Sequence, residues 1–170
     1  MASIIDSLIV EHALLVELFD EIDRLLPDLR TVAEVQLLSR LVEGVLSRHA
    51  DVEQNLAFAA LDHALMEKGP LDRLYQDHQE IDEGLGRASA AAEFSEAVRL
   101  LKGGLSATRD HFRQEEQTVF PLFKKVFDAA SMEAFGAGVS SGASVLGPHG
   151  FGNALRSRLQ NSANPTVRPG

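Results

Sequence analysis

Apolar residues recur every three or four positions along four stretches of this chain, and this periodicity restricts the fold more than any other feature of the sequence. The spacing is typical of amphipathic α-helices that bury one face in a core. Four helices are expected, over residues 3–26, 31 to between 62 and 67, 70–92, and 95–127. The breaks between them are short, so successive helices should be antiparallel neighbours. The sequence therefore predicts an all-α, up-down-up-down four-helix bundle.

Local signals mark where the expected helices begin and where they weaken. Ser3 can cap the first helix, and Thr31 and Glu34 have the spacing of a capping box that opens the second. Inside the fourth helix, Pro121 predicts a kink or local break, because proline lacks the N–H that its turn requires. Gly103-Gly104 is a second weak point in that helix, at about 1 kcal/mol per glycine relative to alanine.

The chain changes character after about residue 135. Residues 136–150 are rich in Gly, Ser and Ala and lack helical periodicity, which predicts a loop or flexible segment. Residues 151–160 could form one short fifth helix, and residues 161–170 should be frayed. The chain is therefore divided into a bundle domain over residues 3–130 and a partly flexible C-terminal extension over residues 131–170.

Composition narrows the possible functions. The 170 residues are 45% hydrophobic, which suffices for one domain with a sizeable core. The formal net charge of -9 makes nucleic acid an unexpected partner. The absence of Cys excludes disulfides, zinc–thiolate sites and iron–sulfur ligation by this chain. No basic region precedes the first apolar residues, and no apolar run is long enough to cross a bilayer. We therefore expect a cytoplasmic protein without a membrane partner.

A histidine pattern appears twice along the four helices. In each half, a helix with a lone histidine is followed by a helix with a His-x-x-x-Glu pair, whose two side chains lie one turn apart on the same face. The six residues are His12, His49, Glu53, His78, His111 and Glu115. Imidazole nitrogens and carboxylate oxygens in these numbers suit two transition-metal ions, and iron is the first candidate.

The spacing by itself is weak support for a metal site, because four of the six histidines have an acidic residue four positions later. Such pairs also stabilise exposed helices. The stronger argument is that each of the four histidines interrupts an apolar stripe, and that the two depths within each helical hairpin match. Burying unpaired imidazoles and carboxylates is costly, and a metal pair compensates all six. His63 and His149 lack this support and receive no role.

The segments EHALLVELFDEIDRL, HADVEQNLAF, DHQEIDEGL and HFRQEEQTVFPLF resemble those of the hemerythrin-like (HHE) cation-binding family, over residues 3–127. The resemblance implies two non-haem iron ions inside the bundle. By position, His12 and His49 would bind one iron, and His78 and His111 the other. Glu53 and Glu115 would bridge the two ions, with an oxo or hydroxo group between them.

The chain departs from the oxygen-carrying hemerythrins, which have a second histidine on the third helix. The two corresponding positions are Leu74 and Asp82. One iron should therefore have an open position, which water, an anion, Asp82 or Tyr75 could fill. The favoured function is binding or sensing of O2, NO or a related small ligand. Peroxide decomposition at the same site and a metal-free helical interaction domain are the alternatives, and the sequence names no protein partner.

Overall fold

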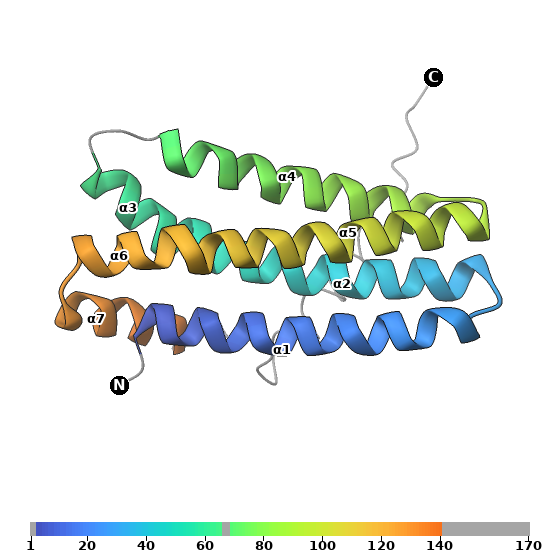
Figure 1. The fold of residues 1–170 in the computed structure, drawn as a ribbon, viewed down its shortest axis with the longest axis horizontal. Coiled ribbons are helices and arrows are strands. Elements are labelled where there is room, and N and C mark those ends of the chain that lie inside the picture. The colour runs from blue at the N-terminus through green and yellow to red at the C-terminus, as the bar shows by residue number, and fades with distance from the viewer. Residues whose placement is uncertain (1–2, 66–68, 141–170) are drawn as a thin grey trace, which may run out of the picture.

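The computed structural model describes residues 3–65 and 69–140, and within them every regular element is a helix. The elements are α1 (Ile4–Leu25), a 3-10 turn (Leu26–Asp28), α2 (Val32–Val52), a π-helical segment (Glu53–Phe58), α3 (Ala59–Ala64), α4 (Gly69–Ala90), α5 (Phe94–Gln114), a second π-helical segment (Glu115–Val119), α6 (Phe120–Val126) and α7 (Ala129–Ser140). Four long rods follow from this order: α1, then α2 with the first π-helical segment and α3, then α4, and then α5 with the second π-helical segment and α6. The rods run antiparallel to their neighbours in the chain (Figure 1). The predicted all-α four-helix bundle is confirmed.

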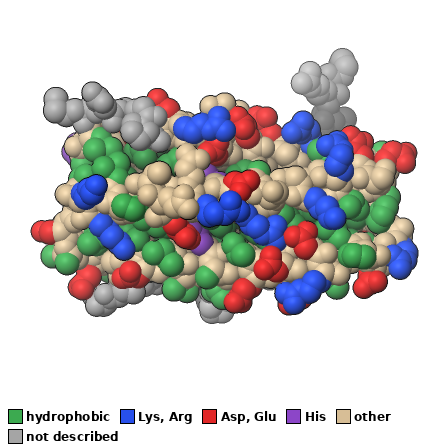
Figure 2. Space-filling view, viewed as in Figure 1, with side chains coloured by type: hydrophobic (Ala, Val, Ile, Leu, Met, Phe, Trp, Pro, Cys, Tyr) green, Lys and Arg blue, Asp and Glu red, His purple; other side chains and the backbone are tan. Residues whose placement is uncertain are grey.

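The face of the bundle in Figure 2 is mixed in charge. Acidic and basic side chains are interspersed on the face in Figure 2, with hydrophobic side chains between them. Within the described residues, no helix is both long and apolar enough to cross a lipid bilayer.

Capping boxes start the first two rods. The Asp6 N–H donates to Ser3 Oγ at 3.2 Å, and the Asp6 carboxylate accepts in turn from the Ser3 N–H. Thr31 and Glu34 form the same reciprocal pair at the start of α2, with the Thr31 N–H 2.8 Å from Glu34 Oε2. Each box satisfies backbone donors that lack a partner within the helix. The predicted helix starts are confirmed at both places.

Two hydrophobic clusters form the core, and a polar layer separates them along the rods. One cluster fills the half that contains Phe19, Leu85 and Leu101. The other fills the half that contains Phe58 and Phe123. The buried polar and charged side chains between the clusters include those with the predicted metal-binding spacing. The same four helices therefore hold the apolar core and a polar centre.

Both π-helical segments begin at a buried glutamate, Glu53 in one rod and Glu115 in the other. A π-turn adds a residue to the helical turn and shifts the register of the side chains that follow it. The second segment directly precedes α6, where Pro121 lies in the first turn. The local break expected at the proline thus takes the form of a π-helical turn, and the rod continues beyond it.

α7 lies beside α1, as Figure 1 shows. Asp128 precedes it and accepts a hydrogen bond from the Ser131 N–H at 2.8 Å. The Phe135 ring packs against Phe123 and Phe127, with centroids 5.9 and 5.4 Å away. The loop expected from residue 136 onward is therefore wrong for residues 136–140, because this capping and aromatic packing override their small-residue composition.

The possible short helix at 151–160 lies outside the described residues, and the domain boundary at residue 130 stays a prediction.

Gly104 allows α4 and α5 to pack closely, whereas its neighbour Gly103 does not touch the opposite helix. A Cβ atom added at Gly104 would lie 2.7 Å from Leu85 Cδ2, while one at Gly103 would meet nothing within 4 Å. We predict that Gly103→Ala stabilises the fold by about 0.5–1 kcal/mol through helix propensity. Gly104→Ala should instead destabilise it by about 1–3 kcal/mol, because the fully buried Leu85 must move. Denaturant unfolding of the two variants measures the difference, and equal stabilisation by both would contradict this account.

Candidate metal centre

The six side chains with metal-binding spacing all meet in the polar layer. His12 comes from α1, His49 from α2, His78 from α4 and His111 from α5. Glu53 and Glu115 come from the first residues of the two π-helical segments. The residues His12, His49, Glu53, His111 and Glu115 are at most 3% exposed. His78 is slightly more open, with 10% of its side chain exposed.

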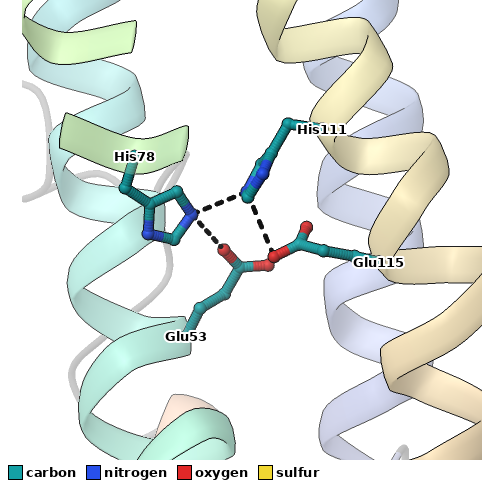
Figure 3. Close-up of side chains that lie close together, drawn as sticks. All are labelled: Glu53, His78, His111 and Glu115. Carbon is teal, nitrogen blue, oxygen red and sulfur yellow. Dashed lines mark hydrogen bonds and ion pairs between the residues drawn. The ribbon is translucent and has the colours of Figure 1, made fainter. Parts of the chain in front are cut away.

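One half of the centre consists of His78 and His111, called here the second histidine pair, with the two glutamates. Figure 3 shows these four side chains pointing toward one another. The two histidine Nε2 atoms are 2.7 Å apart. His78 Nε2 lies 3.3 Å from Glu53 Oε2, and His111 Nε2 lies 3.2 Å from Glu115 Oε1. Ligand atoms of all four lie within 4.8 Å of one another, so the group could hold a metal ion.

The other half consists of His12 and His49, the first histidine pair, and uses the same glutamates. The Nε2 atoms of the pair are 3.1 Å apart. Glu53 Oε1 lies 3.3 Å from His12 Nε2 and 3.2 Å from His49 Nε2. Glu115 Oε2 lies 3.4 Å from His12 Nε2. His12, His49 and Glu53 form a second group that could hold a metal ion.

The electrostatics of the centre reflect two fully buried carboxylates, Glu53 and Glu115. Burial raises the pKa of Glu115 well above its usual range, and the negative charge of Glu53 raises it further. Burial also acts against ionisation of Glu53, but the charge of His49 and hydrogen bonds from the histidines hold its pKa well below its usual range. Burial lowers the pKa of His49, yet Glu53 and Glu11 together raise it to about 10. Both glutamates can ionise only if positive charge lies between them.

Several buried donor and acceptor atoms in the centre have no hydrogen-bond partner. They include both carboxylate oxygens of Glu115, one of Glu53 and Nδ1 of His111. Leaving such groups unpaired costs about 1–3 kcal/mol each, and more when they are charged. A metal cation bound by these oxygens would compensate them. The donor set of imidazole nitrogens and carboxylate oxygens fits a transition metal such as iron.

A set of outer side chains holds the histidines by their other ring nitrogen, Nδ1. Glu11 Oε2 lies 3.1 Å from Nδ1 of His49. Glu116 Oε1 lies 2.9 Å from Nδ1 of His12. In metal sites, acceptors in this position fix the orientation of the imidazole and raise its basicity. The first histidine pair therefore has a close carboxylate partner for each ring.

The second histidine pair has weaker outer partners. The amide nitrogen of Gln54 lies 2.8 Å from His78 Nδ1. Turning this amide over would present its oxygen to an Nδ1–H and leave Nε2 free for a metal. Asp77 Oδ2 lies 3.7 Å from His111 Nδ1, beyond hydrogen-bond distance, while its other oxygen pairs with Arg73 at 2.9 Å. The two halves of the centre are alike in plan but unequal in the strength of their outer contacts.

These outer residues were not identified from the sequence, although the sequence holds a signal for them. An acidic residue directly precedes the first histidine of each half, as Glu11-His12 and Asp77-His78. Each of these acids faces the other histidine of its own half. The residue after each of the two glutamates instead faces the opposite half, as Gln54 does to His78. Predicting this contact with the opposite half requires the rotation of each helix about its own axis, which only the structure gives.

Tyr75, Leu74 and Asp82, the positions considered for a further metal ligand, lie outside the six side chains that meet in the polar layer. The Tyr75 hydroxyl donates to Asp62 Oδ2 at 3.1 Å, and this bond together with burial raises the pKa of Tyr75 to about 12. Leu74 is fully buried in the apolar core. Asp82 is exposed, at the wall of a cavity beside the second histidine pair. His63 is exposed on α3, away from the core, and His149 lies outside the described residues.

Comparison with known proteins agrees with this geometry. A family model, the hemerythrin HHE cation binding domain, matches residues 3–123 of the chain. No curated protein and no solved structure matches it. The matched range includes every residue of the centre and ends within α6, in the fourth rod. The chain belongs to the hemerythrin HHE cation-binding domain family.

Proposed function

We propose that the centre binds two iron ions and that the pair binds or senses O2, NO or a related small ligand. In this proposal the first histidine pair holds one ion and the second histidine pair holds the other. Glu53 and Glu115 bridge the two ions. Bound iron would supply the redox chemistry with small oxidants, and the chain supplies the ligands, their orientation and a largely buried site.

The observation that carries this proposal is the way each glutamate divides its two oxygens. Glu53 turns Oε1 toward the first histidine pair and Oε2 toward His78 of the second. Glu115 turns Oε2 toward His12 and Oε1 toward His111. A carboxylate that served a single ion would not need one oxygen for each histidine pair. The arrangement is the one expected of two carboxylates that bridge two cations.

The metal-free alternative explains the centre less well. It requires two carboxylates to lie within a few ångströms of each other in a dry core, where burial and mutual repulsion oppose their ionisation. It also gives no reason for four imidazoles to direct Nε2 at the same two carboxylates. Replacement of these groups by apolar residues would improve such a core.

Substituting one of the two glutamates distinguishes the iron-binding proposal from the metal-free alternative. We predict that the wild-type chain, loaded anaerobically with ferrous iron, retains two iron ions and that Glu115→Gln retains fewer. Without metal, Glu115→Gln should stabilise the fold by about 1 kcal/mol or more. Burial of Glu115 costs either an enclosed charge or the uptake of a proton on folding, whereas the amide needs neither and can donate to Glu53. Metal analysis and thermal unfolding, each with and without iron, measure these opposite effects.

The control for this experiment is Glu17→Gln, which removes a carboxylate from an exposed position of α1. It should change neither the iron content nor the stability by more than about 0.5 kcal/mol. Wild-type protein that holds no iron, or a Glu115→Gln variant that holds as much as wild type, would contradict the proposal.

The outer contact of Gln54 generates a second prediction. Gln54→Ala removes the partner of His78 Nδ1, and we expect it to weaken retention of iron by about 10–100-fold. Gln54→Glu replaces the amide with a carboxylate acceptor like those of the first histidine pair, and should retain iron at least as tightly as wild type. Competition with a chelator measures retention. Gln79→Ala, which removes an exposed amide bonded to Glu83, is the matched control and should match wild type. Equal retention by all three variants would contradict a role for Gln54.

A further inference from the structure

The first histidine pair is closed off by phenylalanine rings. The Phe112 ring stacks on His12 with centroids 3.9 Å apart and an interplanar angle of 8°. Phe120 lies on the same imidazole at 5.5 Å, and the edge of Phe112 meets His49 at 5.2 Å. His12 and His49 are each only 1% exposed. A small molecule that approached His12 from the side of these rings would have to displace a buried aromatic ring.

A cavity reaches the centre from the other side. It has a volume of about 290 Å³, lies between α2, α4 and α5, and has His49 and both histidines of the second pair in its walls. Ala50, Ile81 and Thr108 line it further. A molecule of liquid water occupies about 30 Å³, so the cavity has room for a ligand of a few heavy atoms. The greater exposure of His78 agrees with access from this side.

A larger groove between α1 and α5, of about 490 Å³, touches the centre only at His12. The His12 Nδ1 atom pairs with Glu116, a residue that also lines this groove. The opposite nitrogen, Nε2, faces His49 and Glu53 inside the bundle. The groove therefore meets the outer side of the imidazole and not the nitrogen that would bind a metal.

From these contacts we propose that an outside ligand reaches the centre through the α2–α4–α5 cavity and binds at the ion held by His78 and His111. This inference rests on the proposed iron pair. The buried Leu74 offers no ligand atom on the α4 side, which leaves that ion a position for a small molecule. The two ions are thus unequal, because aromatic rings cover His12 of the first pair, whereas both histidines of the second pair line the cavity.

A matched pair of alanine substitutions tests the path. Ala50 and Ala13 each directly follow a histidine of the first pair, but Ala50 lines the cavity and Ala13 lines the groove. The probe is nitric oxide, mixed rapidly with ferrous protein and followed by visible absorption. Ala50→Leu places a larger side chain in the cavity and should slow binding by about tenfold or more. Ala13→Leu should leave the rate within about twofold of wild type.

Iron content and thermal unfolding of both variants are measured first, so that a change in rate is not a loss of metal or fold. A slower rate in Ala50→Leu alone supports the path. Equal rates in all three proteins, or a slower rate in Ala13→Leu alone, would overturn it while leaving the iron pair intact. If Ala50→Leu loses iron, Ser47→Leu narrows the same cavity from an exposed position of α2, and an unchanged rate there would also overturn the proposal. Failure of the iron pair itself is recognised separately, by wild-type protein that binds no iron.

Discussion

Two buried carboxylates, Glu53 and Glu115, lie in the middle of this bundle, and much of the structure follows from how they are held. Each is fully enclosed, and neither has enough hydrogen-bond donors for its oxygens. Four imidazoles supply the nearest polar contacts, one from each rod. Polar groups at this density divide the apolar core into two clusters. The two clusters must then stabilise the fold without help from its centre, unless a cation compensates the carboxylates.

The two halves of the chain hold this centre by the same plan. In each, the acid before the first histidine faces the second histidine, and the residue after the glutamate faces a histidine of the other half. A π-helical turn begins at each glutamate. The plan is not followed equally, because Gln54 stands where the other half has Glu116, and the Asp77 contact is longer than that of Glu11. The weaker outer contacts belong to the second histidine pair, and both of its histidines line the α2–α4–α5 cavity.

The fold and the six central residues could be predicted from the sequence, because both depend on helical periodicity. Helix ends were predictable where a side chain caps them, as Thr31 does. The π-helical turns were not, although Pro121 marked the second of them as a local break. Glu116, the outer partner of His12, was missed because this contact depends on how two rods are rotated toward each other. α7 was not predicted, because contacts of Phe135 with distant aromatic rings outweigh the local signal of its glycines.

The central claim is that two iron ions lie between Glu53 and Glu115. Diffraction from crystals of the iron-loaded protein, recorded at the iron absorption edge, tests it most directly. The account predicts two anomalous peaks separated by about 3.5–4 Å, one beside the first histidine pair and one beside the second, with a glutamate oxygen turned to each. A single peak, or peaks away from these six side chains, would contradict it.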